Sequence, residues 1–146
     1  MAGTVVADTL QADSTSTLVL KNGVANTPPT VQDSAGTQIG TFCRAWVNFN
    51  GTGTVAIRAS FNVSSITDNG TGDYTVNITN ALPDANYAVA ITASAGTNNS
   101  ALVGTVKSAT QYGAPSNQTT TACQIVFVNY VNTLIDTGAI YVSIFR

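Results

Sequence analysis

The sequence has no glutamate and no histidine, and charged residues make up only 8% of its 146 residues. About a quarter of the residues of an average globular domain are charged. Without histidine, the chain cannot form a Ser-His-Asp triad or a Cys-His nucleophile. A glycosidase needs two facing carboxylates, and among the seven acidic residues, all aspartates, only Asp68 and Asp73 form a close pair. The composition therefore predicts no enzyme activity and no cofactor.

Basic residues are also scarce, with five lysines and arginines and a net charge of −2. This balance argues against a nucleic-acid partner, because binding to phosphates depends on lysine and arginine. No apolar run approaches the roughly 20 residues of a membrane-spanning helix. The first residues, Met1–Thr4, carry no basic segment followed by an apolar one. We therefore expect no membrane insertion and no cleaved secretion signal.

The chain contains two cysteines, Cys43 and Cys123, which are too few for a zinc site. The favoured interpretation is that both are small buried apolar residues. A disulfide between two strands remains the alternative. The absence of a visible secretion signal favours reduced thiols when the protein is made.

Valine, threonine, asparagine, serine and glycine replace the missing charge, and this composition favours strands and turns over helices. Residues 73–79 alternate, with Tyr74, Val76 and Ile78 on one face, as in a half-buried antiparallel strand. Similar segments recur about every ten residues, separated by glycine-rich turns. Between Asp68 and Asp73 a hairpin turn is favoured over a calcium site. The chain is therefore predicted to be all-β, with an antiparallel β-sandwich or jelly-roll-like domain.

Residues 1–40 differ from residues 41–146, which we predict to be the β-sandwich domain. The first segment has short apolar pieces, at residues 4–7 and 17–20, between polar stretches and a Pro28-Pro29 pair. Two interpretations remain: a disordered linker, or an extended N-terminal arm that becomes ordered on a partner chain. The recurring apolar pieces favour the arm.

The strand edges have few charged residues to protect them, since Lys21 and Lys107 are the only lysines. The continuous apolar run of residues 122–131 suggests burial on both faces, with one face in a subunit contact. The apolar C-terminal segment, residues 138–146, needs pairing within a sheet to avoid fraying. We therefore predict a homotrimer that covers these edges, with candidate interface residues Ile125, Phe127, Tyr130, Tyr141 and Phe145.

Candidate ligand-binding residues lie in the polar stretches at residues 96–100 and 110–121. Their amides and one tyrosine could contact a glycan, although the same residue types also form turns. Trp46 could stack on a sugar ring, but a packing role in the core or an interface is favoured for a strand tryptophan between Ala45 and Val47. Arg44 and Arg58 are expected to pair with aspartates, either between strands or across subunits. The candidate ligand or receptor residues are Asn98, Asn99, Gln111, Tyr112, Asn117 and Gln118.

Several longer segments are distinctive: residues 43–58 (CRAWVNFNGTGTVAIR), 60–66, 68–77, 83–89 and the final VSIFR. Together they resemble the C-terminal domains of tail-fibre-like proteins of tailed bacteriophages, particularly those infecting marine bacteria. The stretch at residues 28–36 is similar to the segment that precedes such domains. The likeness covers most of residues 18–95 and the last five, whereas residues 96–121 match no pattern of the family.

The resemblance implies a structural protein of a virion, made in the host cytoplasm, with no catalytic residue to carry over. Because the domain begins soon after Met1, we expect a short fibre or appendage rather than a long fibre. It would be a homotrimer attached to capsid or tail proteins through its N-terminal arm. The alternatives are a head decoration protein that stabilises the shell and a tip that recognises host surface glycans. A polysaccharide-degrading spike is disfavoured, since no facing acid pair is evident.

Overall fold

A computed structural model describes residues 20, 29–94, 102–108 and 117–146, and this part of the chain contains strands and no helix. The all-β prediction is confirmed. The strands are β1 (Val31–Gln32), β2 (Gln38–Gly40), β3 (Cys43–Asn50), β4 (Ala56–Phe61), β5 (Val63–Gly70), β6 (Asp73–Ile78), β7 (Ala88–Ala93), β8 (Leu102–Val106), β9 (Ala122–Asn129) and β10 (Ile140–Phe145).

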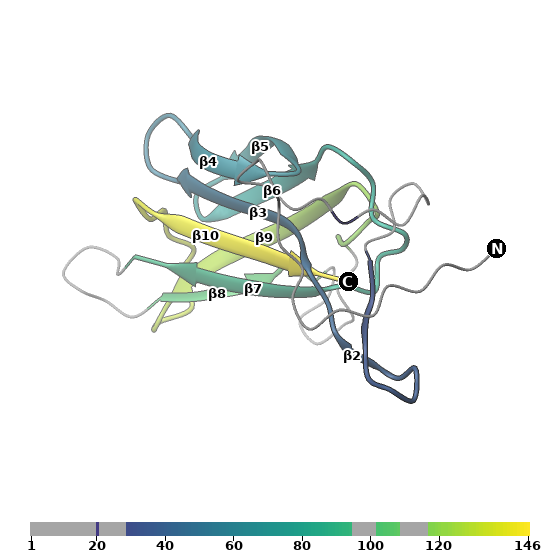
Figure 1. The fold of residues 1–146 in the computed structure, drawn as a ribbon. Helices are drawn as coiled ribbons and strands as arrows, with labels where there is room; N and C mark the ends of the chain where they lie inside the picture. The colour runs from purple at the N-terminus through teal and green to yellow at the C-terminus, as the bar shows by residue number, and fades with distance from the viewer. Residues whose placement is uncertain (1–19, 21–28, 95–101, 109–116) are drawn as a thin grey trace.

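Two four-stranded antiparallel sheets form the main body, which agrees with the predicted β-sandwich. The front sheet has the order β4-β3-β10-β7, from top to bottom in Figure 1, and the rear sheet has the order β5-β6-β9-β8. Hairpins join β3 to β4 and β5 to β6, and β8 pairs with β9 in antiparallel orientation. The pairings of β10 with β3 and of β9 with β6 join segments far apart in the sequence. The C-terminal strand is therefore held between β3 and β7, as its apolar character requires.

Alternation along the strands separates the core from the surface. Tyr74, Val76 and Ile78 are buried on β6, as predicted. On β10, Ile140 and Ile144 are likewise buried. The inward side chains of both sheets form a single apolar core, because successive residues of a strand point to opposite faces.

The prediction for β9 needs correction. Ile125 and Phe127 are fully buried in the chain's own core, and the ring of Phe127 lies 6.3 Å from that of Tyr74. Val126 and Val128, which alternate with them, are partly exposed. The strand thus has a single core-facing side despite its continuous apolarity. The prediction that Ile125 and Phe127 lie in a subunit interface is wrong, because packing between the two sheets already covers both side chains.

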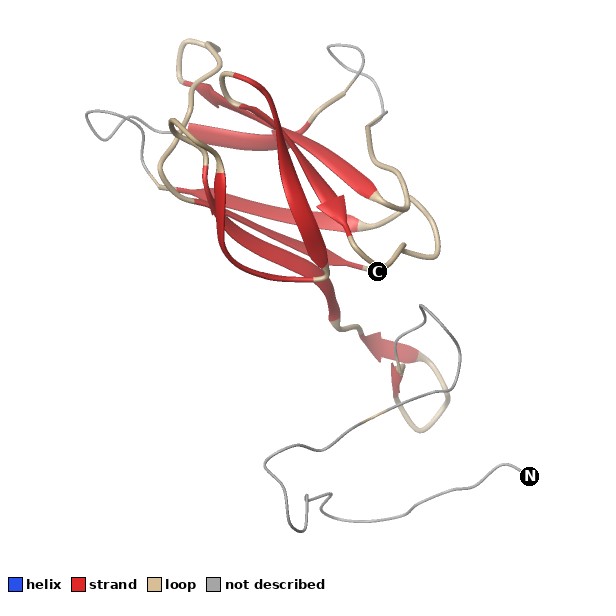
Figure 2. Ribbon diagram, turned by 90° about the horizontal axis from the view of Figure 1, so that it is seen from above, coloured by secondary structure: helices blue, strands red, loops and turns tan. Residues whose placement is uncertain are grey.

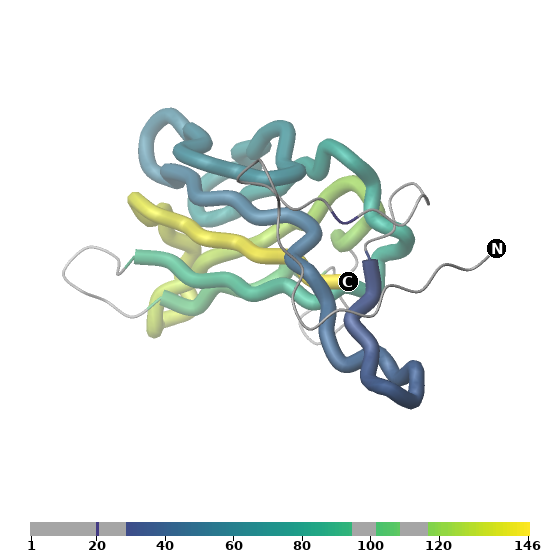
Figure 3. The backbone as a smooth tube through the Cα atoms, in the orientation of Figure 1, coloured from purple at the N-terminus to yellow at the C-terminus, as the bar shows by residue number. Residues whose placement is uncertain are grey.

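The chain passes from the front sheet to the rear sheet at Asn62, which separates β4 from β5 and has a positive φ of 55°. Its amide nitrogen lies 3.0 Å from the carbonyl of Arg44 and 3.2 Å from that of Asn80. The backbone N–H of Asn80 donates to the side-chain oxygen of Asn62 at 2.7 Å. These bonds stabilise the corner between β4 and β5, and Figure 3 shows the backbone passing there from one sheet to the other.

A separate two-stranded sheet, formed by β1 and β2, precedes the sandwich. The carboxylate of Asp33 caps its turn by accepting hydrogen bonds from the N–H groups of Ala35 and Thr37, both at 2.9 Å. Figure 2 shows this hairpin projecting away from the two sheets. Within the predicted arm at residues 1–40, the structure describes only residue 20 and residues 29–40.

Both cysteines are free thiols. Cys123 is buried in the rear sheet, and Cys43 is partly buried in the front sheet. The interpretation as small buried apolar residues is therefore confirmed for Cys123 and holds in part for Cys43, and the structure contains no bond between them.

Candidate functional site

The outer faces of the two sheets differ in chemistry. On the rear sheet, the amide of Asn77 lies 3.0 Å from the hydroxyl of Ser65 and 2.9 Å from that of Thr67. The amide of Asn69 bonds the hydroxyl of Thr75 at 2.9 Å in the same way. These short polar side chains bond to one another between β5 and β6, so this part of the outer face is a hydrated surface.

The outer face of the front sheet carries exposed aromatic side chains. Trp46 is 39% exposed, Phe61 54% and Tyr141 46%. Directly paired residues share a face of the sheet, and Phe61 pairs with Trp46 while Asn48 pairs with Tyr141. Three aromatic residues from three strands therefore share this face. We call this group, with its polar neighbours, the aromatic platform: Trp46, Asn48, Arg58, Phe61 and Tyr141.

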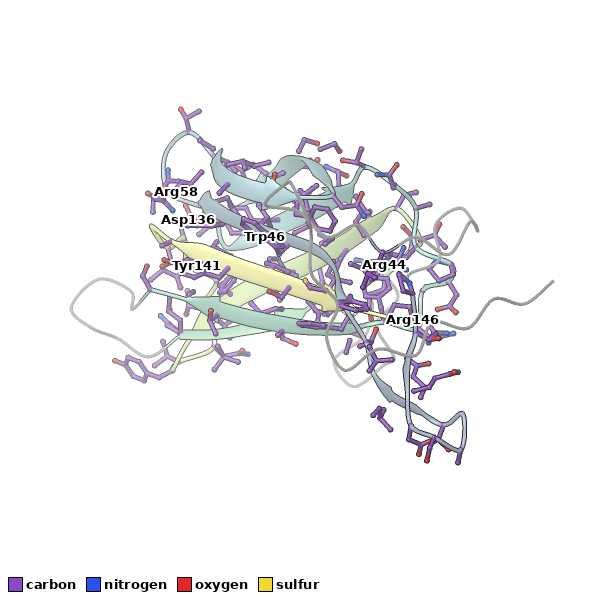
Figure 4. The ribbon with its side chains drawn as sticks, viewed as in Figure 1. Arg44, Trp46, Arg58, Asp136, Tyr141 and Arg146 are labelled. Atoms are coloured by element: carbon purple, nitrogen blue, oxygen red, sulfur yellow. The ribbon has the colours of Figure 1, made fainter. Side chains whose placement is uncertain are left out.

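Positive charge also gathers on the front sheet. All three arginines of the chain belong to it: Arg44 on β3, Arg58 on β4 and Arg146 directly after β10. None of its four strands contains an acidic residue. Figure 4 shows Arg58 and Tyr141 toward one end of this face, Trp46 between, and Arg44 and Arg146 at the other end.

The arginines have different partners. Arg146 forms an ion pair with Asp84, and this contact lowers the pKa of Asp84 and raises that of Arg146. Arg58 donates to the carbonyl of Gly138 and, at 3.4 Å, to the amide oxygen of Asn48. Within the described residues it has no carboxylate partner. The expected pairing between strands is therefore not formed by Arg58 among the described residues, because Asn48 on β3 and Gly138 before β10 offer amide and carbonyl oxygens instead. Pairing with an aspartate of another subunit stays a prediction.

A shallow cleft lies at the Arg44 end of the face, where the β1–β2 hairpin meets the sandwich. Both guanidinium-bearing residues of this end, Arg44 and Arg146, line it. The remaining lining residues are uncharged: Pro29, Thr30, Gln38, Thr41 and Pro83.

A second surface is apolar rather than cationic. The edge strands β7 and β8 lie on the same side of the sandwich, and neither contains a charged residue. Close to β8, the turn after β9 is held by a bridge between Val128 and Leu134. Four apolar side chains are exposed along β8 and this turn, with Tyr130 80% exposed. We call β7, β8 and these side chains the apolar edge: Val103, Tyr130, Val131 and Leu134.

The predicted interface residues are therefore divided among three places. Ile125 and Phe127 lie in the core, and Tyr130 lies on the apolar edge. Tyr141 lies on the outer face of the front sheet, and Phe145 is partly buried on that face beside Ala88. The structure does not bring the five together.

Most of the predicted ligand residues, namely Asn98, Asn99, Gln111 and Tyr112, lie outside the described residues. Asn117 donates to the amide oxygen of Gln124 at 2.6 Å, and Gln118 donates to the carbonyl of Tyr87 at 3.1 Å. These two hydrogen bonds hold residues 117 and 118 against the sandwich.

The sequence interpretation missed the platform. The sequence predicts that Trp46 packs in the core or an interface. The structure excludes the core, since Trp46 lies on the outer face, and an interface role stays a prediction. Alternation alone separates Trp46 from the buried Ala45 and Val47, and this signal was available in the sequence. The sequence could not show in this way that Phe61 lies beside Trp46, because the pairing of β3 with β4 shifts register between Asn48 and Phe49.

Among the described residues, no three cysteine or aspartate side chains are grouped closely enough to hold a metal ion. In the same part of the chain, no helix is long and apolar enough to span a membrane. No family model, no curated protein and no solved structure matches this chain.

Proposed function

We propose that this chain is a structural protein of a bacteriophage particle, a short fibre or appendage that assembles as a homotrimer. The resemblance of most of residues 18–95 and of the last five to tail-fibre-like domains supports the virion role. The attachment of the trimer through residues 1–40 is part of the same proposal. The observation that carries the self-assembly is the apolar edge.

Exposed sheet edges are normally protected by charged side chains, because unpaired backbone groups would otherwise pair with another chain. On the apolar edge, neither β7 nor β8 supplies such a charge. Val103 is 59% exposed and Tyr130 80% exposed beside them. Several large apolar side chains exposed in one region of a surface are typical of a protein–protein contact. We therefore assign the subunit contact to this edge, and Tyr130 is the one predicted interface residue that lies there.

Light scattering after gel filtration tests the assembly. The wild-type chain is expected to have the mass of three chains. Val103→Lys and Tyr130→Lys each place a charge on the apolar edge and should reduce the mass to that of one chain. Ala56→Lys is the control, since Ala56 is exposed on β4, the opposite edge of the front sheet. A monomeric wild type at high concentration, or trimers that survive both lysine variants, would contradict the proposed contact.

Labelled antibody on intact particles tests the virion role. Label at the tail supports the short fibre, whereas label on the head indicates a decoration protein instead. Particles that carry no label, although the antibody recognises the purified protein, would contradict the virion role itself.

A further inference from the structure

We infer that the aromatic platform binds an acidic saccharide, a short sugar chain bearing carboxylate groups. This binding function does not depend on the proposed self-assembly. The platform is centred on β4, β3 and β10, whereas the apolar edge lies along β7 and β8. Both surfaces can therefore be occupied at the same time.

The aromatic residues supply the apolar part of the site. Trp46, Phe61 and Tyr141 are each between 39% and 54% exposed on one flat sheet face. A pyranose ring has an apolar C–H face that packs against an aromatic ring, while its hydroxyls point outward from the rim. Asn48 and Ser143 occupy positions among the aromatic residues, opposite Tyr141 and Trp46. Their amide and hydroxyl groups are donors and acceptors suited to sugar hydroxyls.

The charge distribution selects an acidic sugar over a neutral one. Arg58 bonds only neutral oxygens, those of Asn48 and Gly138, so its positive charge is not cancelled by a carboxylate among the described residues. The four strands of the sheet contain no acidic residue. The nearby carboxylate is that of Asp136, which Figure 4 shows beside Arg58 and which accepts hydrogen bonds from Tyr74 and from the N–H of Gly72. A guanidinium group binds a carboxylate through charge-assisted hydrogen bonds, which are stronger than neutral ones.

The shape of the face favours a short oligosaccharide over a nucleic acid. Arg44 and Asn48 are four residues apart on β3, so the face extends roughly 13 Å along the strands. Arg44 lines the cleft at one end, and Arg58 contacts Asn48 at the other. Arg58 at one end of this length can meet one carboxylate of a short sugar chain, while the aromatic rings lie along the rest of the face. A nucleic acid requires many closely spaced phosphate contacts, and this face does not offer them.

Trp46 provides a direct readout, because it is the only tryptophan of the chain. Titration with hexagalacturonate, a hexasaccharide of a uronic acid, should change the tryptophan emission in a saturable way. Maltohexaose, a neutral hexasaccharide, should leave the emission unchanged at the same concentrations. Added salt should weaken the binding of hexagalacturonate, since part of the attraction is electrostatic.

Variants locate the site. Arg58→Gln is expected to weaken the binding of hexagalacturonate about tenfold, the effect of losing a charge-assisted hydrogen bond. Arg58→Lys retains the charge and should recover part of that affinity. Phe61→Ala should also weaken binding, whereas Tyr130→Ala, on the apolar edge, should not. Circular dichroism of each variant establishes that the β-sheet signal is retained.

Three results would overturn the inference: no saturable change with hexagalacturonate, equal binding of maltohexaose, or unchanged affinity in both Arg58→Gln and Phe61→Ala. Binding of a thymidine hexanucleotide with equal or higher affinity would replace the saccharide with a nucleic acid. Light scattering on the same samples reports the oligomeric state separately, so failure of this inference is distinguishable from failure of the proposed assembly.

Discussion

The hydroxyl of Tyr74 lies 2.7 Å from a carboxylate oxygen of Asp136 and 2.6 Å from the backbone carbonyl of Gly51. Tyr74 belongs to the rear sheet, whereas Gly51 follows β3 and Asp136 precedes β10 of the front sheet. The same oxygen of Asp136 accepts the N–H of Gly72 at 2.7 Å. Burial and the nearby carboxylate raise the pKa of Tyr74, so its hydroxyl stays protonated. One buried side chain therefore links both sheets at this end of the sandwich.

Tyr74→Phe should lower the free energy of unfolding by about 1–3 kcal/mol, because it removes the partner of buried oxygen acceptors while keeping the ring. The ring packs edge-on to Phe49 at a centroid distance of 5.4 Å, and this contact is preserved. Urea denaturation measures the change. Tyr141→Phe is the matched control, since Tyr141 is 46% exposed and should be neutral. Equal stability of both variants would exclude a stabilising role for the link.

The carboxylate of Asp73 should make stability depend on pH. Burial raises its pKa, but hydrogen bonds from Lys107, Gln124 and Asn69 outweigh burial and hold the pKa below its ordinary value of 3.8. The resulting stabilisation is present above pH 3.8 and is lost as the pH falls through the lowered pKa. Asp73→Asn is expected to destabilise the protein at pH 7 and to flatten the acid limb of a plot of unfolding free energy against pH. Lys107→Met should act in the same direction, and an unaltered acid limb in both variants would contradict this assignment.

Gly72 should be intolerant of any side chain. Its φ is +65°, and a Cβ there would lie 2.7 Å from the nitrogen of Ile135 and 2.8 Å from the carbonyl oxygen of Phe127. Gly53 has a similar φ of +61° but open space around it. We expect Gly53→Ala to lower the free energy of unfolding by about 1–2 kcal/mol, because a side chain at a positive φ strains the backbone. Gly72→Ala should lower the free energy of unfolding by about 1–3 kcal/mol more than Gly53→Ala, because the backbone atoms of Ile135 and Phe127 must move away from the new Cβ.

Thermal or urea unfolding of the two glycine variants measures that difference. The comparison isolates the effect of crowding, since the strain from a positive φ is common to both. Equal losses of stability would mean that the segment around Ile135 moves aside at little cost.

Cys123 should be unreactive in the folded protein. Burial raises the pKa of its thiol to about 11, so little thiolate is present at pH 8, and the side chain is inaccessible. Iodoacetamide at pH 8 should modify Cys43 first, with Cys123 labelled only after denaturation. Peptide mass spectrometry identifies the modified residue. Rapid native labelling of Cys123 would show that the rear sheet opens readily.

Much of the fold follows from local patterns. The two-residue alternation of β6 predicts which side chains face the core, and the structure agrees at Tyr74, Val76 and Ile78. The turn between Asp68 and Asp73 was predicted on the same local basis, and Asp68 caps it by accepting the N–H of Gly70 at 2.9 Å. These features depend on neighbours in the sequence, so the sequence is sufficient to predict them.

Alternation was insufficient for β9, where a continuous apolar run hid a single buried face. Val126 and Val128 lie on the outer side of that strand, while Ile125 and Phe127 face the core. Apolar residues on the outer side remove the contrast in polarity by which alternation is recognised. Only the position of the front sheet shows which side is buried.

By itself, the sequence determined the all-β class, the turns and the inward faces of several strands, because each of these depends on the chemistry of adjacent residues. The tertiary structure decided which distant strands pair. Pairing of β3 with β10 and β4, together with the register shift beside Asn48, brings Trp46, Tyr141 and Phe61 onto one face with Arg58. Strand register depends on loop closure and on packing across the whole core, and neither can be inferred from the local period of a strand. The aromatic platform is therefore a product of the fold.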